Sequence, residues 1–327
     1  MKIITKTATK TVREITTKSV AKTLAITIAQ CELKNASRVT NLSVGVLCLL
    51  SLNTVAVAAE APSMKPKVEV EHRFLNMTNL KKEEGKFAFS ASKISVSNLF
   101  ASANYEQWRL DWRDVSKLPA TLSDGIKKPV EVMHSASLGG RYMVRLNEQQ
   151  SLLSGLGVSM TYESQTTDSL SVNGYSMVIH KLQNEWSIVY GGTVSYHPVQ
   201  SRILPIAGFS YRMQKPLGWS GTLGFPRSYV AYGLSPKWQV STGLVYNTVL
   251  AKLAKESVIQ ADGYGEIKAW QSDLAIKYQP EKHWSIQASL RYSPVYEFTT
   301  YNARGSRQNT FHMQPASGAA LSASYQF

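Results

Sequence analysis

Some residues of this chain have the chemistry of a hydrolase, but their spacing does not form a catalytic site. A serine nucleophile needs a base within hydrogen-bonding reach, and His134 stands directly before Ser135. Because successive side chains of a strand point to opposite faces, we expect these two to point apart. The sequence has no Gly-x-Ser-x-Gly and no His-Glu-x-x-His motif. We predict no enzyme and no catalytic residues; a lipid-modifying enzyme with residues far apart in the chain stays an alternative.

Thiol chemistry is confined to the first part of the chain. The two cysteines, Cys31 and Cys48, both precede residue 59. If residues 1–58 are removed, no disulfide, thiolate metal site or cysteine nucleophile can form. We therefore predict no metal site and no bound cofactor.

Basic residues recur on one face of several segments with strand-like alternation. That face otherwise carries small and polar side chains, and only Asp111 and Asp273 add negative charge to it. Arginine and lysine rings favour anions in pores, so we predict a narrow, positively lined lumen that takes small anionic solutes. The alternative is a structural barrel whose arginines pair with acids and fill the lumen. The basic residues predicted to face inward are Arg109, Arg113, Arg141, Arg145, Arg212, Lys277 and Arg291.

A third functional alternative is surface recognition. The polar segment 297–314 contains Tyr301, Arg304, Arg307 and Phe311. Aromatic and arginine side chains are common at binding hot spots. Arginine also forms bidentate hydrogen bonds with phosphate groups. This segment would suit a surface receptor or adhesin, or contact with the phosphates of lipopolysaccharide.

Alternation with a period of two identifies the elements that carry these residues. In 284–292 every second residue is Trp, Ile, Ala, Leu or Tyr, and the residues between are Ser, Gln, Ser and Arg. The aromatics stand at the two ends of the apolar face, as in the girdles of a membrane barrel. Short polar turns followed by Trp recur at 184–188, 236–240 and 282–286. These patterns predict an all-β chain that folds as a transmembrane, antiparallel, up-and-down β-barrel of 12–14 strands.

The range in strand number has a specific cause. The segments 219–224 and 227–233 are too short to span a bilayer, which takes about 9–11 residues. If this hairpin folds inward, the barrel has twelve strands. The predicted strands are 67–76, 86–97, 100–113, 132–145, 151–163, 174–181, 186–196, 203–213, 219–224, 227–233, 238–249, 266–278, 284–296 and 316–327.

The chain begins with an export signal. Residues 42–59 form an apolar segment that ends in Ala56-Val57-Ala58, the small-residue pattern of a cleavage site. The basic region before it is unusually long. We predict a signal peptide with an extended n-region over 1–58, and a barrel domain over 59–327. Export and a membrane barrel together indicate the outer membrane of a Gram-negative bacterium, with its lipids and lipopolysaccharide as partners.

The positive charge does not indicate a nucleic-acid partner. The formal net charge is +14, and it is +8 when residues 1–58 are left out. The remaining basic residues are scattered along the chain, without the clustered patch that nucleic acids require. We predict no binding to nucleic acid.

Two stretches carry resemblances to known proteins. The last strand places Leu321, Tyr325 and the terminal Phe327 on one face, which resembles the signal that the outer-membrane assembly machinery recognises. Residues 204–242 contain Leu-Gly-Phe-Pro-Arg followed by a Pro-x-Trp turn, and they resemble an uncharacterised family of bacterial outer-membrane β-barrels, a domain of unknown function. The resemblance implies a porin-like barrel fold and no activity. Arg227, the arginine of this motif, either guards a constriction in the lumen or begins the strand after a structural turn.

Overall fold

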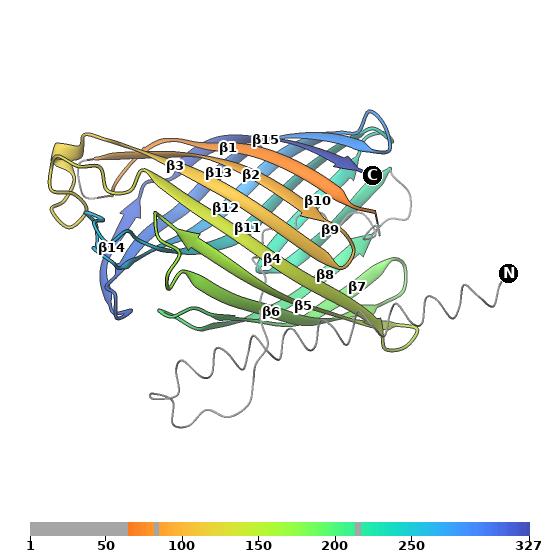
Figure 1. The fold of residues 1–327 in the computed structure, drawn as a ribbon. Helices are drawn as coiled ribbons and strands as arrows, with labels where there is room; N and C mark the ends of the chain where they lie inside the picture. The colour runs from red at the N-terminus through yellow and green to blue at the C-terminus, as the bar shows by residue number, and fades with distance from the viewer. Residues whose placement is uncertain (1–64, 82–84, 213–216) are drawn as a thin grey trace, which may run out of the picture. The chain divides into compact units, whose positions relative to one another are not determined.

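The chain folds into antiparallel β-strands (Figure 1). The computed structural model describes residues 65–81, 85–212 and 217–327, so the signal peptide predicted for 1–58 lies outside the described residues. A short 3-10 helix, η2 (Val115–Lys117), lies in the connection after β3. In chain order, the strands are β1 (Lys67–Asn79), β2 (Lys86–Ser97), β3 (Ala101–Arg113), β4 (Val132–Arg145), β5 (Gln150–Tyr162), β6 (Leu170–Lys181), β7 (Trp186–Tyr196), β8 (Arg202–Arg212), β9 (Gly218–Phe225), β10 (Arg227–Gly233), β11 (Trp238–Lys252), β12 (Tyr264–Tyr278), β13 (Trp284–Tyr301), β14 (Arg307–Met313) and β15 (Ala316–Gln326).

The sheet closes on itself as a ring of fourteen positions. From β1 to β14 consecutive strands of the chain pair with each other, β15 pairs with β13, and β1 closes the ring against β15. β14 and β15 share one position, because both pair with β13: Tyr296 lies opposite Met313 of β14, and Ser293 lies opposite Ala316 of β15. A closed ring leaves no edge strand with unpaired backbone groups, which is what a bilayer demands. The predicted transmembrane, antiparallel up-and-down barrel is confirmed, with fourteen strands.

The two short strands belong to the wall. β9 pairs with β8 up to Phe225, and β10 pairs with β11 from Arg227. The hairpin between them turns at Pro226. Beyond it β8 and β11 continue, and β11 runs on to Lys252 without a partner from β10. This difference in strand length lets the upper part of β11 leave the wall.

The two ends of the barrel differ in their connections. In the view of Figure 1 the long-loop end is at the left, and the short-turn end, with the C-terminus, is at the right. The longest connections at the long-loop end are 114–131 and 253–263. The connections of the short-turn end that the structure describes in full are 98–100, 146–149, 182–185, 234–237 and 279–283.

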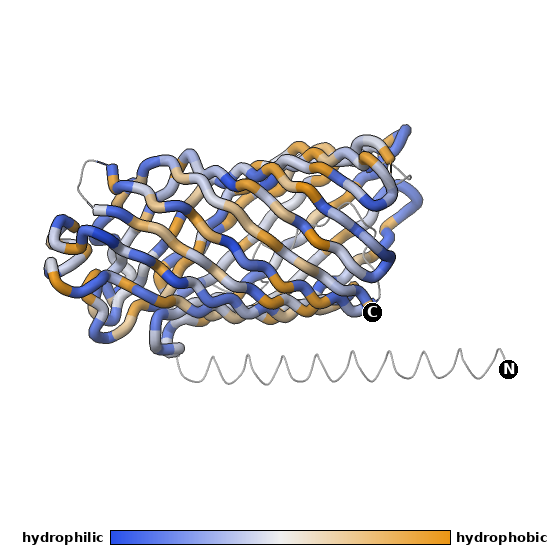
Figure 2. The backbone as a smooth tube through the Cα atoms, turned by 90° about the horizontal axis from the view of Figure 1, so that it is seen from above, coloured by the Kyte–Doolittle hydropathy of each residue, from blue (hydrophilic) through white to orange (hydrophobic). Residues whose placement is uncertain are grey.

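A girdle of paired aromatic rings surrounds the short-turn end. Trp side chains begin β7, β11 and β13 after the short turns, as the repeated turn-Trp pattern predicts, and Trp219 stands near the start of β9. Figure 2 shows apolar residues alternating with polar ones along the strands. Indole and phenol rings have an apolar body and a polar tip, which suits a membrane interface. The outward pairs, with ring centroids 4.4–5.0 Å apart, are Trp186–Tyr211, Trp219–Tyr232, Trp238–Tyr278 and Trp284–Tyr325.

At the long-loop end the apolar side chains turn inward. Trp108 and Trp112 of β3 are buried inside the barrel, where Leu122 of the connection 114–131 is completely buried beside them. Phe87 of β2 packs against Trp112 with ring centroids 4.8 Å apart. The connection 114–131 therefore contributes to a hydrophobic core that fills the mouth of the barrel.

Candidate functional site

The ends of β11 to β14 leave the wall and fold across the mouth. β11 stands between β10 and β12, yet its last residue, Lys252, pairs with Tyr162 of β5 on another part of the ring. The backbone N–H of Glu163 donates to the carbonyl oxygen of Lys252 at 2.8 Å. We call residues 246–270 and 295–313 the mouth cap. It reaches across to β5 at the long-loop end.

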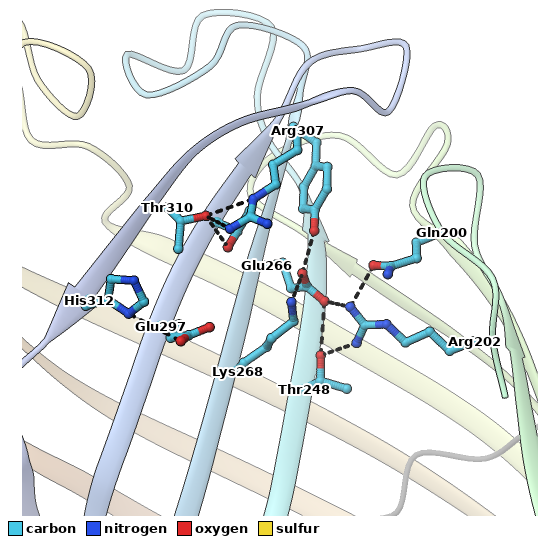
Figure 3. Close-up of polar contacts among 11 residues, drawn as sticks. Gln200, Arg202, Thr248, Glu266, Lys268, Glu297, Arg307, Thr310 and His312 are labelled. Atoms are coloured by element: carbon cyan, nitrogen blue, oxygen red, sulfur yellow. Dashed lines mark hydrogen bonds and ion pairs between the residues drawn. The ribbon is translucent and has the colours of Figure 1, made fainter. Parts of the chain in front are cut away.

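A buried carboxylate ties the cap to the wall (Figure 3). Glu266 of β12 is completely buried and forms an ion pair with Arg202 of β8. Lys268 lies 3.1 Å from the same carboxylate, and the Tyr301 hydroxyl donates to it at 2.6 Å. Thr248 of β11 adds a bond of 3.3 Å. A buried charge is tolerated only when it is paired and hydrogen-bonded, so this cluster holds β8, β11, β12 and β13 together.

A second polar contact fixes the tip of the cap. Lys252 forms an ion pair with Asp262 at 3.0 Å, and its ammonium lies 4.4 Å from the centroid of the Tyr264 ring. The hydrogen bond from Lys252 lowers the pKa of the Asp262 carboxyl. On the facing wall, Glu163 accepts a bond from the backbone N–H of Ala254 at 2.8 Å, and burial raises the pKa of the Glu163 carboxyl. Cap and wall are thus joined at two places.

His197 lies at the same junction as a neutral side chain. It follows β7, is 4% exposed, and meets the edge of the Tyr264 ring at 5.4 Å. Burial, together with the charges of Arg202 and Lys252, lowers the pKa of His197 to about 4. The backbone N–H of Val199 donates to its Nδ1 at 3.2 Å. In the neutral ring the proton is therefore on Nε2.

Below the cap, the lumen holds two cavities. The turn-end cavity, about 330 Å³, opens among β1, β2, β9 to β13 and β15. The mouth cavity, about 230 Å³, lies between the cap and the wall formed by β3 to β8. Seven basic and three acidic side chains line the turn-end cavity: Lys67, Arg73, Lys93, Arg227, Lys237, Lys277 and Arg291, with Glu69, Glu71 and Asp273.

Crossed ion pairs separate the two cavities. Arg291 of β13 donates to Glu71 of β1 at 2.6 Å, and Arg73 of β1 pairs with Glu106 of β3. The guanidinium of Arg73 also lies 5.4 Å from the centroid of the Trp108 ring. Arg73, Arg291 and Lys93 line both cavities. This junction is the charged part of the lumen that the two cavities share.

The inward basic residues of the sequence prediction fall into three groups. The first group, Arg227, Lys277 and Arg291, lines the turn-end cavity. Arg227 begins β10 and lies over the Tyr229 ring at 5.8 Å, so the arginine of the Leu-Gly-Phe-Pro-Arg motif reaches the lumen. The structure therefore brings these three side chains together from β10, β12 and β13.

The second group lies at the rim of the short-turn end. Arg141 donates to the carbonyl oxygens of Asn98 and Leu99 at 2.8 and 2.9 Å. Arg145 is exposed and donates to the carbonyl of Asn147 at 3.1 Å, and Arg212 is exposed at the end of β8. None of the three arginines lines either cavity. Arg141 and Arg145 hold turns in place, so these two act on the shape of the rim.

The third group was predicted on the wrong face. Arg109 and Arg113 are exposed, and the residues between and before them, such as Trp108 and Trp112, are buried. Near its end β3 reaches the capped mouth, where the inside is a hydrophobic core. There the polar face of the strand is the outer one, so polar side chains, which indicate the lumen near the membrane centre, indicate the outside here.

The segment 297–314 also differs from the prediction of a loop. Most of it forms the upper part of β13 and the strand β14. Tyr301 and Phe311, expected as surface contacts, are 8% and 7% exposed within the cap. Arg304 and Arg307 are exposed, and Arg307 donates to Thr310 at 2.6 Å. The hairpin continues because its apolar side chains are needed to fill the mouth.

Sequence reasoning missed the charged residues of β1 and β2 at the cavity junction. Alternate positions of β1 carry the charged residues Lys67, Glu69, Glu71 and Arg73. On the other face of the strand, Val70 and Phe74 are exposed on the outside. This alternation is visible in the sequence. A run of ionic residues otherwise resembles a solvated segment, and the period of two is the signal that distinguishes a lumen-facing strand from it.

His134 and Ser135 do point to opposite faces, as their adjacency predicts. His134 lies on the outer face, with its Nδ1 2.8 Å from the Tyr105 hydroxyl. Ser135 points inward, lines the mouth cavity and bonds Thr161 at 3.0 Å. The pair cannot act as nucleophile and base.

The three residues of the predicted assembly signal lie together on β15 and the C-terminus. Leu321 and Phe327 are 59% and 58% exposed, and the rings of Tyr325 and Phe327 meet edge to face at 5.0 Å. Their recognition by the assembly machinery stays a prediction. Within residues 65–81, 85–212 and 217–327, no group of three or more His, Cys, Asp or Glu side chains is placed to bind a metal ion. The same residues contain no helix that is long and apolar enough to cross a bilayer.

Comparison with solved structures gives similarity in fold at very low sequence identity. The chain is similar to an outer-membrane channel from Pseudomonas putida F1, at 8% identity and a TM-score of 0.45, over 83% of this chain and 98% of that one. It is similar to the KdgM porin at 8% identity and a TM-score of 0.35, over 80% and 99% of the two chains. The outer-membrane protease OmpT from Escherichia coli also matches, at 8% identity and a TM-score of 0.24, over 83% and 99%.

The sequence matches no protein-family model and no curated protein. The resemblance of residues 204–242 to an uncharacterised barrel family therefore stays a prediction.

Proposed function

We propose that the protein is an integral outer-membrane barrel that works as a narrow passive channel for small anionic solutes, and that it is not an enzyme. The observation that carries this proposal is the lining of the turn-end cavity, where seven basic side chains face three acidic ones. Basic linings favour anions in pores. An outer apolar face with an aromatic girdle supports a place in the bilayer.

The mouth cap gives this channel its closed state. Cap and wall meet through the cluster around Glu266 and through Lys252 and Asp262, and a solute must pass this contact to enter from the long-loop end. We propose that the cap limits conductance.

Ion selectivity in planar bilayers tests the channel. Purified protein in a salt gradient should give a reversal potential on the anion side. Arg227→Gln combined with Lys277→Gln should lower the anion-to-cation permeability ratio by roughly twofold or more, because both side chains line the cavity. Arg109→Gln is the matched control, since Arg109 is exposed on the outer face.

Two outcomes would contradict the channel. One is protein that inserts into the bilayer and conducts no ions. The other is a double variant with the selectivity of the unaltered protein. Release of fatty acid from phospholipid by the purified protein would favour the lipid-modifying alternative instead.

A further inference from the structure

Buried polar atoms that lack a hydrogen bond are concentrated in the residues that line the mouth cavity. Among the described residues, seven buried side-chain nitrogen or oxygen atoms lack a hydrogen bond, and six of them belong to residues that line this cavity. Such atoms are rare in folded proteins, and a cluster of them calls for an occupant. The six are Asn104 Oδ1, Glu106 Oε1, Trp108 Nε1, His197 Nε2, Arg291 Nε and Tyr296 OH.

Donors predominate among these atoms. Trp108 Nε1 and Arg291 Nε can only donate, and His197 Nε2 carries the proton because its Nδ1 accepts from Val199. Glu106 is already in an ion pair with Arg73, which leaves Asn104 Oδ1 as the acceptor without any partner. The occupant must therefore bring several acceptor oxygens.

One wall of the cavity is lined by hydroxyl and amide groups. Neighbouring members bond one another: Asn104 donates to Ser137 at 3.1 Å, and Asn173 donates to Ser159 at 2.9 Å. Hydroxyl groups can both donate and accept, so they match a ligand that carries hydroxyls. The inward residues of this wall, from β3 to β7, are Asn104, Ser135, Ser137, Ser159, Thr161, Ser171, Asn173, Thr193 and Ser195.

Another part of the lining is apolar and aromatic, and positive charge stands beside it. Phe89 and Trp108 stack with centroids 5.7 Å apart, and Tyr296 stands beside Phe89 at 6.5 Å. At the junction, Arg73 and Arg291 are paired with Glu106 and Glu71. Lys93 has no ion pair within 4.0 Å in the described part of the chain, and its charge acts on Glu71 from a greater distance.

The volume limits the size of the occupant. The cavity holds about 230 Å³, below the range of about 300–1,000 Å³ that suits drug-sized ligands. It has room for a solute of few carbon atoms.

We propose that the mouth cavity is a binding site for a small polyhydroxylated carboxylate. Its carboxylate lies toward Lys93 and Arg291 and accepts from the unpaired donors, its hydroxyls bond the Ser/Thr/Asn wall, and its C–H groups contact the aromatic wall. This inference rests on the proposed function in one respect: the solute reaches the site through the lumen of the channel.

Calorimetry with three matched six-carbon solutes tests the site without any variant. Protein purified in detergent from bacterial membranes should bind gluconate, which has both hydroxyls and a carboxylate. Sorbitol lacks the charge and hexanoate lacks the hydroxyls. Each should therefore bind at least tenfold more weakly than gluconate, which is a difference of about 1.4 kcal/mol in binding free energy. Equal binding of all three solutes, or no binding of gluconate, would overturn the proposal.

Two variants then place the ligand. Lys93→Gln should weaken gluconate by about tenfold and leave sorbitol unchanged, and Trp108→Phe, which keeps the ring and removes the N–H, should weaken it severalfold. Arg109→Gln, next to Trp108 but exposed, is the control. Gluconate binding that survives Lys93→Gln in a folded protein contradicts the site. Conductance without gluconate binding would refute this site alone, and binding without conductance would refute the channel alone.

Discussion

The two halves of this barrel use the same alternation with opposite polarity. Toward the short-turn end, Val70 and Phe74 of β1 are exposed on the outside, and Glu71 and Arg73 point into the lumen. At the long-loop end, Trp112 of β3 points inward and is buried, and its neighbour Arg113 is outside. The difference shows that a period of two identifies a strand. Which face is inside depends on what surrounds each half.

The largest effect should come from removing a buried ring at the long-loop end, where the apolar side chains point inward. Phe87 is 1% exposed inside the mouth, where it contacts Trp112 and Tyr296. Phe87→Ala should lower the free energy of unfolding by about 3–5 kcal/mol, because it removes a buried ring and leaves a cavity. Phe74→Ala, on the outer face of β1, is the control and should cost less. Denaturant unfolding in detergent measures both, and equal losses would contradict the inverted polarity.

The cap should loosen next when its buried carboxylate is neutralised. Glu266→Gln leaves Arg202 and Lys268 facing each other without the shared anion, which should cost about 3 kcal/mol and raise single-channel conductance. Asp111→Asn removes an exposed partner of Arg113 and should change stability by less than about 1 kcal/mol. A Glu266→Gln variant with unaltered conductance would show that the cap does not limit ion flow.

Acidification should act on the same contact to a similar extent. The pKa of His197 falls from 6.5 to about 4 in the folded chain, so between these values the unfolded chain binds the proton more readily. Stability from His197 is complete above pH 6.5 and is lost as the pH falls toward 4, by about 3 kcal/mol in total. Hydrogen exchange of the cap at pH 7 and pH 4 measures the loss.

The variant His197→Asn isolates this contribution. It keeps an acceptor near the Nδ1 position and cannot titrate, so its cap should lose less protection on acidification than that of the unaltered protein. The raised pKa of Glu163 stabilises the protonated form and strengthens the fold as the pH falls, but it is common to both proteins and cancels. An equal loss in the two proteins would assign the pH response to another group.

The smallest change in stability is expected on the outer surface of the long-loop end. Arg304 and Arg307 are exposed on the β13–β14 hairpin, so Arg304→Ala with Arg307→Ala should change stability by no more than about 0.5 kcal/mol. Binding to lipopolysaccharide vesicles at low salt should weaken, because arginine contacts phosphate strongly. Lys65→Ala, at the other end of the barrel, is the control. Unchanged vesicle binding would show that these arginines do not contact the phosphates of lipopolysaccharide.

Local patterns were enough for most of the wall. The strands 86–97, 132–145, 186–196 and 227–233 were predicted with the bounds that the structure has. Each is framed by turn residues, and alternation within a strand needs no partner to be read. The Trp residues after the short turns likewise have a place at the interface that their own amphipathic side chains dictate.

The upper parts of β11 to β14 were beyond local reasoning. Predictions ended β11 at 249 and β13 at 296, yet they continue to Lys252 and Tyr301. Their apolar side chains pack against Phe87 and the connection 114–131, which are distant in the chain, and a contact between distant segments leaves no periodic signal in either.

By itself, the sequence determined that the chain crosses a membrane as strands, since side chains that alternate between apolar and polar must separate two environments. It also determined where the short turns and the aromatic girdle stand. Only the tertiary structure decided that the mouth is capped, that Arg109 lies outside while Arg73 lies inside, and that Glu266 meets Arg202. These are properties of a closed ring, in which curvature and strand length bring together residues that are far apart along the chain.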